Sequence, residues 1–282
     1  MSTSHPLAFT TTALVAVLAL YASFPSNGYW ASLGATGAAA LVSTGLWRAM
    51  RPGSSPSGAL PFEVGRGKSG DPKSVGLTVC VLLATAACAS CVRGMAGASA
   101  LESVGGSPAS PEGAGLFFGI LALAVLACAT GAFEEALFRG VVQTGFARAG
   151  NQAGSGNALL KGVLATSLLF ALLHASGVVE AQYAMPRNAL WFAVLAKTVT
   201  AFGFSVAMGF LYAATGRLAV PIAVHAVFDI IDTLPTLFST GGASMGGVAL
   251  AGAGAVSTVM VALGCMVVAA YCMHRLRDCQ GA

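Results

Sequence analysis

Residues 116–146 read LFFGILALAVLACATGAFEEALFRGVVQTGF, an apolar stretch in which only Glu134, Glu135 and Arg139 are charged. About 20 apolar residues are enough to cross a bilayer as a helix. A charged side chain at bilayer depth costs on the order of 2.5–3.5 kcal/mol on insertion scales. We therefore expect the charges of this stretch to be offset inside the protein and to be retained for function.

Other apolar stretches of similar length lie on both sides of this one. They cover residues 7–24, 29–47, 75–98, 159–183, 189–214, 218–238 and 248–273. The chain is 56% apolar and only 9% charged, which is typical of a polytopic membrane protein and excludes an ordinary soluble domain. We predict an all-α fold of about eight transmembrane helices around a central intramembrane cavity. Residues 29–47 are rich in small side chains, so a count of seven helices also remains open.

Most basic residues lie in or beside alternate connections between these stretches, and the opposite connections hold only Arg187. The set is Arg48, Arg51, Arg66, Lys68, Lys73, Arg148, Lys161, Arg217, Arg275 and Arg277. The positive-inside rule then predicts that both termini are cytoplasmic. The net charge of +4 therefore reflects membrane topology. We expect the lipid bilayer as a partner and no nucleic acid.

Three regions follow from this pattern. Residues 1–98 hold the N-terminal membrane helices and a cytoplasmic loop, residues 115–240 a helical core, and residues 246–282 the last membrane helix with a cytoplasmic tail. No repeat of fixed period is visible, which argues against a transporter built from duplicated halves.

Two more groups of ionisable residues interrupt apolar stretches, in Phe170-Ala-Leu-Leu-His174 and in His225-Ala-Val-Phe-Asp229. Residues four apart share a helix face, so we expect Phe170 to pack against His174 and Asp229 to lie beside His225.

The same spacing places Glu135 beside Arg139 as a buried ion pair that supports the structure. Glu134 is rotated by about 100° from its neighbour and can face the cavity. An unpaired carboxylate inside a membrane is a functional candidate by default. These groups form one site only if their helices present them at the same depth, so we predict that the fourth helix continues through Phe146.

Glu134, His174 and His225 allow two chemistries that both lead to hydrolysis. They can bind a metal such as zinc and activate its water, or a carboxylate and a histidine can activate the water directly. We expect no cofactor, and zinc on these three residues is the alternative.

The chain resembles the CPBP intramembrane proteases, a group that includes the CAAX prenyl endopeptidases and many bacterial relatives. The family pattern is Glu-Glu-x-x-x-Arg, Phe-x-x-x-His and His-x-x-x-Asn or Asp on separate membrane helices. All three motifs occur here in that order, and the resemblance extends from about Phe117 to Leu237. It implies a peptidase with a protein or peptide substrate at the membrane and a catalytic cavity within the bilayer.

The resemblance also implies catalytic roles. Glu134 and His174 would activate the water, and His225 with Asp229 would stabilise the oxyanion. An ionised aspartate can only accept hydrogen bonds, whereas an asparagine could donate one. We therefore expect Asp229 to orient or charge His225, whose imidazolium would contact the oxyanion.

Two alternatives to a peptidase remain. The chain could be a non-proteolytic membrane scaffold or bacteriocin-immunity protein, or a proton-coupled transporter with Glu134, His174 and Asp229 as a relay. Arg93 and Lys197 also interrupt apolar stretches. We interpret both as snorkelling to an interface, with pairing to Asp232 or a role in holding substrate as the alternative.

Overall fold

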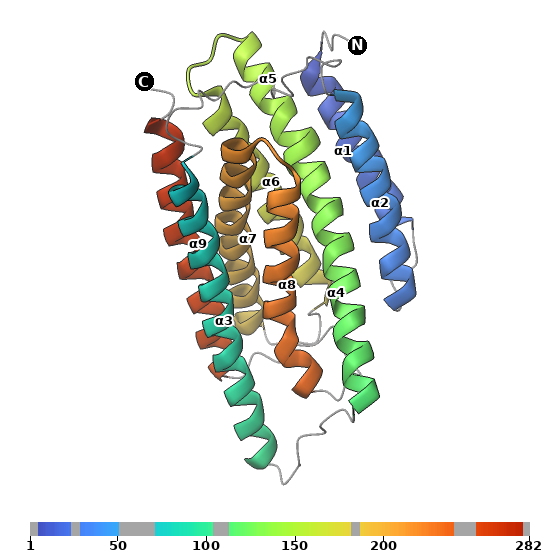
Figure 1. Ribbon diagram of the computed structural model, residues 1–282, viewed down its shortest axis with the longest axis vertical. Helices are drawn as coiled ribbons and strands as arrows, with labels where there is room; N and C mark the ends of the chain where they lie inside the picture. Colours follow the sequence, from blue (N-terminus) through green and yellow to red (C-terminus); the bar gives the residue numbers. More distant parts are fainter. Residues whose placement is uncertain are drawn as a thin grey trace.

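The computed structural model describes residues 5–23, 29–50, 71–103, 113–181, 187–239 and 252–278. Within these ranges all regular structure is helical (Figure 1). The helices are α1 (Pro6–Ala22), α2 (Tyr29–Met50), α3 (Pro72–Ser103), α4 (Gly113–Glu135), the π-helix η1 (Ala136–Gln143), α5 (Thr144–Gln152), α6 (Ala158–Ala181), α7 (Arg187–Thr215), α8 (Ala219–Ser239) and α9 (Gly252–Asp278).

α4, η1 and α5 form one continuous rod, so the described helices make up eight rods that correspond to the eight apolar stretches. Five of the described helical segments are long and apolar enough to cross a membrane, and α1 is a shorter apolar helix. The predicted fold class, an all-α polytopic membrane protein, is confirmed. The number of membrane crossings and the three sequence regions stay predictions.

The rods pack side by side into a bundle with α7 at its centre (Figure 1). α7 packs closely on α6 and α9 but only lightly on α8, which instead packs on α3 and α4. The C-terminal half of α7 contains an apolar segment, Ala207 to Leu211, whose residues are all buried. α8 therefore lies against α3 and α4 and also contacts α7.

The rod that contains Glu134 continues well past Phe146, as predicted, and ends at Gln152. Its apolar span from Gly115 to Gln152 has 38 residues, and at 1.5 Å per residue it is about 57 Å long, more than a bilayer core requires. Glu134 and Glu135 therefore lie near the middle of the rod, at a depth that other helices can also reach.

The π-helical turn of η1 begins directly after Glu135 and was not predicted. All eight of its residues are buried. The Thr144 hydroxyl donates to the carbonyl oxygen of Arg139 at 3.0 Å, which gives this carbonyl a partner at the end of the wide turn. π-helical turns inside α-helices are frequent at functional sites. Here the turn sets where Arg139 lies relative to the two glutamates.

Arg93 does not snorkel to an interface: it joins α3 to α8. Its guanidinium forms an ion pair with the Asp232 carboxylate and donates to the Asp232 carbonyl oxygen at 2.9 Å. Pro235 lies inside α8 and has no N–H to donate to the carbonyl of Ile231. The Ser90 hydroxyl of α3 donates to this carbonyl instead, at 2.5 Å. Two α3 side chains thus satisfy backbone groups near the proline of α8.

Replacing Ser90 by alanine is expected to destabilise the protein by about 1–3 kcal/mol, because the Ile231 carbonyl then has no donor. Thermal unfolding in detergent measures this effect. In a Pro235→Ala background the helix regains its own donor, so the same Ser90→Ala change is expected to cost much less. Equal costs in the two backgrounds would contradict the proposed role of Ser90.

Candidate active site

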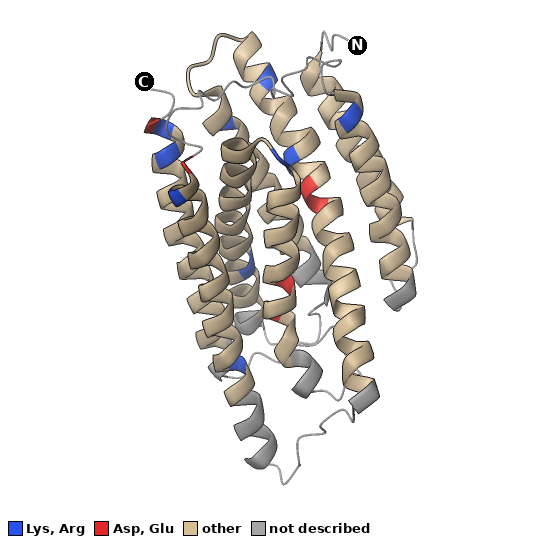
Figure 2. Cartoon of the chain, viewed as in Figure 1, with Lys and Arg blue, Asp and Glu red and all other residues tan. Residues whose placement is uncertain are grey.

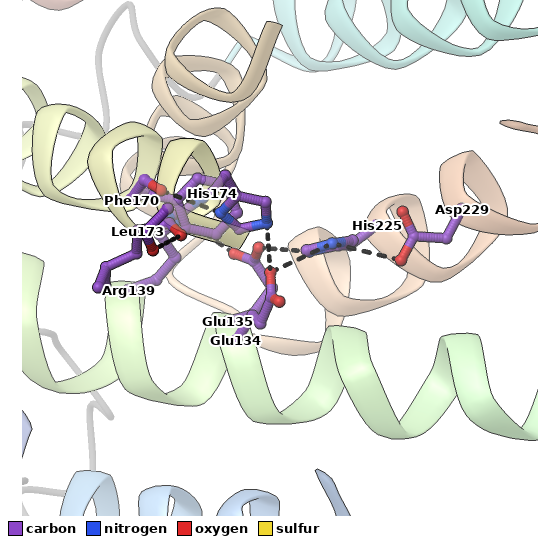
Figure 3. A network of polar contacts seen from close by, with 9 residues as sticks. Glu134, Glu135, Arg139, Phe170, Leu173, His174, His225 and Asp229 are labelled. Carbon is purple, nitrogen blue, oxygen red and sulfur yellow. Dashed lines mark hydrogen bonds and ion pairs between the residues drawn. The ribbon is translucent and has the colours of Figure 1, made fainter. Parts of the chain in front are cut away.

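Side chains of three rods meet at one depth of the bundle (Figure 3). Glu134 and Glu135 come from the end of α4, and Arg139 comes from η1. α6 supplies His174, while His225 and Asp229 come from α8. The structure thus brings together all six residues that the sequence singled out.

A glycine one helical turn before Glu135 lets α4 and α8 approach closely. A Cβ atom added at Gly131 would lie 3.1 Å from the carbonyl oxygen of Ile222 and 3.5 Å from the Cβ of His225. Small residues allow this kind of backbone approach between membrane helices. The close approach holds His225 within hydrogen-bonding reach of Glu135.

Replacing Gly131 by valine is expected to push α4 and α8 apart and to cost about 1–3 kcal/mol of stability, as overpacking of a close contact usually does. It should also separate Glu135 from His225 and lower any activity of the site. Gly115, on the same helix, has no atom within 4 Å of its added Cβ, so Gly115→Val is the matched control. Thermal unfolding and activity would be measured for both, and equal behaviour of the two variants would contradict this role for Gly131.

Glu135 bridges two helices with its two carboxylate oxygens. Its Oε2 lies 3.0 Å from Nε of Arg139, and its Oε1 lies 2.8 Å from Nδ1 of His225. The Glu135 and Arg139 side chains are completely buried, and His225 is nearly so. Because a carboxylate paired with arginine can only accept, Nδ1 of His225 donates the hydrogen bond. Glu135 therefore fixes the ring of His225 with Nε2 turned toward the other acids.

The sequence predicted that Glu135 pairs with Arg139 only. It also predicted that Asp229 orients His225. In the structure Asp229 lies on the Nε2 side of the ring, with Oδ2 3.5 Å from Nε2. Glu135 makes the hydrogen bond at the other ring nitrogen. The contact between Glu135 and His225 joins residues 90 positions apart, and the sequence spacing gave no signal for it.

His174 is oriented by its own helix and by an aromatic neighbour. Its Nδ1 donates to the Phe170 carbonyl oxygen at 2.9 Å, because a carbonyl can only accept. The Phe170 ring stacks on the imidazole with centroids 4.1 Å apart, as predicted, and the Arg139 guanidinium lies over the same ring at 5.3 Å. In the neutral imidazole, Nε2 is then the acceptor nitrogen and is turned toward Glu134.

Glu134 faces both histidines without a direct hydrogen bond to either. Its Oε2 lies 3.8 Å from Nε2 of His174 and 3.7 Å from Nε2 of His225. This oxygen is buried and has no hydrogen-bond partner among the described residues. Polar groups separated by more than about 3.5 Å are commonly bridged by water. Both separations from Glu134 are of the size that a bridging water spans, and both histidines face this carboxylate (Figure 3).

Phe204 of α7 packs against His225, and the sequence did not predict this contact. Its ring meets the edge of His225 with centroids 4.8 Å apart and also contacts Phe228 at 4.7 Å. Phenylalanine is common in membrane helices, so its type and position carry no signal of this role. Phe204 therefore packs against the imidazole of His225 from α7.

Among the described residues, no group of three or more His, Cys, Asp or Glu side chains is arranged to hold a metal ion. Nδ1 of His225 bonds to Glu135 and Nδ1 of His174 to the Phe170 carbonyl, so the two Nε2 atoms, Glu134 and Asp229 are the donors that face the site. We derive no chemical step through a metal.

Comparison with protein families decides the class of this site. Residues 116–231 match the family model of the type II CAAX prenyl endopeptidase Rce1-like proteins. Over these residues the chain is similar to the Rce1-like family. The matched range contains the three motifs on α4 with η1, α6 and α8. No curated protein and no solved structure matches the chain.

The Rce1-like match confirms the predicted resemblance and the predicted enzyme class, a peptidase. In this Rce1-like segment the residue at the end of the His-x-x-x motif is Asp229, with a third of its side chain exposed. The roles of the individual residues stay predictions.

Proposed function

We propose that this protein is an intramembrane endopeptidase that hydrolyses a peptide bond in a membrane-associated or lipidated protein or peptide. The observation that carries this proposal is the unpartnered Oε2 of Glu134, which faces Nε2 of both His174 and His225. A buried carboxylate oxygen beside two imidazole nitrogens is suited to hold and activate a water molecule. The Rce1-like match supports the same reaction class.

Glu134 acts as the general base in the proposed mechanism. The water donates one hydrogen bond to Glu134 and the other to Nε2 of His174, whose Nδ1 is committed to the Phe170 carbonyl. Both acceptors direct an oxygen lone pair toward the substrate carbonyl carbon. As the C–O bond forms, Glu134 takes a proton from the water.

His225 stabilises the negative charge that develops on the substrate oxygen. Carboxylates adjoin both of its ring nitrogens, Glu135 at Nδ1 and Asp229 at Nε2, and this suits the imidazolium form. Nε2–H is then the donor to the oxyanion, a role that Asp229 itself cannot fill while ionised.

The proton held by Glu134 passes to the leaving nitrogen when the C–N bond breaks. The products are a carboxylic acid and an amine, and Glu134 returns to its starting carboxylate form. Helices rather than loops carry all of these groups, which favours a well-defined geometry. The proposed reaction needs no cofactor.

Both termini are proposed to be cytoplasmic. α1 begins and α9 ends at the same end of the bundle (Figure 1), and the basic residues gather mainly toward that end (Figure 2). The positive-inside rule assigns such an end to the cytoplasm. Thiol labelling of a cysteine added near either terminus should occur only from the cytoplasmic side, and labelling from the opposite side would reverse this topology.

Mass spectrometry of membrane-protein termini, with active protein and with the Glu134→Gln variant, tests the proposed function. New termini that depend on active protein identify both the activity and the substrate. The same comparison with a zinc chelator should give an unchanged set of termini, because no metal takes part. A non-proteolytic scaffold or immunity protein would instead give identical termini with both proteins and keep its biological effect in the variant.

A further inference from the structure

Trp47, near the end of α2, packs against the π-helical turn η1 and lies outside the residues that match the Rce1-like family. α1 and α2 lie side by side along the rod formed by α4, η1 and α5 (Figure 1). The six residues of the candidate active site all lie on other helices. The N-terminal helices nevertheless pack on the turn that directly follows Glu135, and this contact connects them to the site.

The indole of Trp47 lies directly on Gly140, the residue after Arg139. A Cβ atom added at Gly140 would lie 2.8 Å from Cδ1, 2.9 Å from Cγ and 3.1 Å from Cβ of Trp47. Carbon atoms pack best at about 3.5–4.0 Å, so these separations are too short for any side chain. The position of Trp47 therefore requires a glycine at residue 140.

Trp47 also holds η1 against a distant helix. It packs against two buried clusters that each contain a residue of η1: Ala136 with Tyr212 and Leu218, and Val141 with Ala13 and Met50. The Nε1–H of Trp47 donates a hydrogen bond to the Tyr212 hydroxyl of α7 at 3.1 Å. One side chain thus connects α2 to α7 across the π-helical turn.

The end of α2 is fixed to the rod a second time, just beyond η1. The Arg148 guanidinium of α5 donates to the carbonyl oxygen of Met50, the last residue of α2, at 2.8 Å. Carbonyls at the end of a helix have no partner within that helix, so this bond also caps α2. The two contacts fix the end of α2, and with it Trp47, at one height along the rod.

A π-helical turn depends on such packing because its i→i+5 hydrogen bonds are rare and occur mostly in single turns inside α-helices. If η1 relaxed to an α-helix, the residues after Glu135 would rotate about the rod axis, and Arg139 would shift relative to Glu135. Glu135 holds Nε of Arg139 at 3.0 Å with one oxygen and Nδ1 of His225 at 2.8 Å with the other. The shift would therefore reach the histidine.

We propose that Trp47 is a positioning residue: its packing on Gly140 holds η1 in the π-helical form that sets the orientation of His225. The effect passes through Arg139 and Glu135, which connect η1 to the histidine. Its consequence for hydrolysis rests on the proposed function.

Cleavage kinetics of Trp47 variants test this role. The substrate is a synthetic peptide that spans a bond cleaved in the comparison of termini. Trp47→Ala is expected to lower kcat about tenfold to hundredfold with little change in KM, because a misplaced histidine weakens contacts made in the transition state. Trp47→Phe keeps an aromatic ring on Gly140 and should restore most of kcat. Equal losses in the two variants would overturn the role of ring packing.

Two controls separate positioning from a general loss of stability. Trp191→Ala removes a tryptophan that is 68% exposed on α7, so its kcat should equal that of wild-type protein. Leu276→Ala opens a cavity in α9, which packs mainly on α3 and α7, and should lower the unfolding temperature without lowering kcat. If Leu276→Ala lowers kcat as much as Trp47→Ala does at an equal loss of stability, the role of Trp47 is only structural and the inference is overturned.

The contact is also tested from the side of Gly140. Gly140→Ala places a Cβ atom against Trp47, so it should lower kcat in the wild-type background and much less in the Trp47→Ala background. Gly45→Ala on α2 is the matched control, because no atom lies within 4 Å of its added Cβ. Additive losses for Gly140→Ala and Trp47→Ala would overturn direct contact as the cause.

Nitrogen NMR of the histidine side chains reads the position of His225 without cleavage. The chain has four histidines, and isotope labelling with a His225→Gln reference assigns the Nδ1–H that donates to Glu135. Trp47→Ala should shift or broaden this signal, whereas Trp191→Ala and Leu276→Ala should leave it unchanged. If the comparison of termini finds no cleaved bond but this change is seen, the hydrolytic proposal fails while the positioning role holds. An unchanged His225 signal in Trp47→Ala would overturn the inference.

Discussion

Replacing Glu134 by glutamine is expected to lower peptide hydrolysis by a factor of at least about 10²–10⁴ while the protein remains folded. Glutamine keeps the size of the side chain but cannot take a proton from water. The buried Oε2 of Glu134 has no hydrogen-bond partner among the described residues, so removal of the charge breaks no hydrogen bond of the fold. We therefore expect equal or higher thermal stability, as is common when a functional group is removed from an active site.

Single-turnover cleavage and thermal unfolding in detergent measure the two parts of this prediction. Asp278→Asn is the control, because it makes the same carboxylate-to-amide change at the exposed end of α9. Wild-type cleavage by the Glu134→Gln variant would exclude Glu134 as the base. A large loss of stability would instead indicate that Glu134 supports the fold.

The adjacent Glu135→Gln change is expected to have the opposite signature, with a loss of about 3–5 kcal/mol of stability together with activity. The change leaves the completely buried Arg139 without its counterion and weakens the hydrogen bond to Nδ1 of His225. Urea or thermal unfolding of the two neighbouring variants provides a direct comparison. The Glu134→Gln variant should therefore lose activity and keep its stability, whereas the Glu135→Gln variant should lose both.

A second variant separates the structural role of Glu135 from its positioning role. The double change Glu135→Gln with Arg139→Met removes both charges, and replacing a buried ion pair by groups of similar volume often restores stability. Activity should stay low, because His225 has lost the carboxylate that orients and charges its ring. Recovery of activity along with stability would show that Glu135 acts only through the ion pair with Arg139.

Contacts between residues of one helix were predictable from spacing. The pairs Glu135 with Arg139 and Phe170 with His174 follow from the period of an α-helix, and both are present. The extension of the helix beyond Gly140 was also predictable, because the three groups had to meet at one depth. These predictions depend only on local geometry, which is the same wherever the helix lies in the bundle.

Contacts between helices were not predictable in the same way. Snorkelling was the preferred interpretation of Arg93, and the structure shows the alternative instead, a pair with Asp232 across α3 and α8. Spacing within a helix says nothing about which helix lies opposite, and the hydrophobic pattern of a membrane helix is too uniform to identify its neighbours. The π-helical turn after Glu135 was missed for a related reason, because the segment is buried on all sides and the packing around it contributes to its geometry.

The sequence by itself determined that the chain is a bundle of membrane-spanning helices and that its ionisable residues had to meet inside. The reason is the high cost of an isolated charge in a bilayer, which applies whatever the arrangement of the helices. Only the tertiary structure decided that Glu135 orients His225 and that Glu134 is left facing two imidazoles. Those relations depend on the close approach of α4 to α8 at Gly131, which is set by packing between segments that are distant in the sequence.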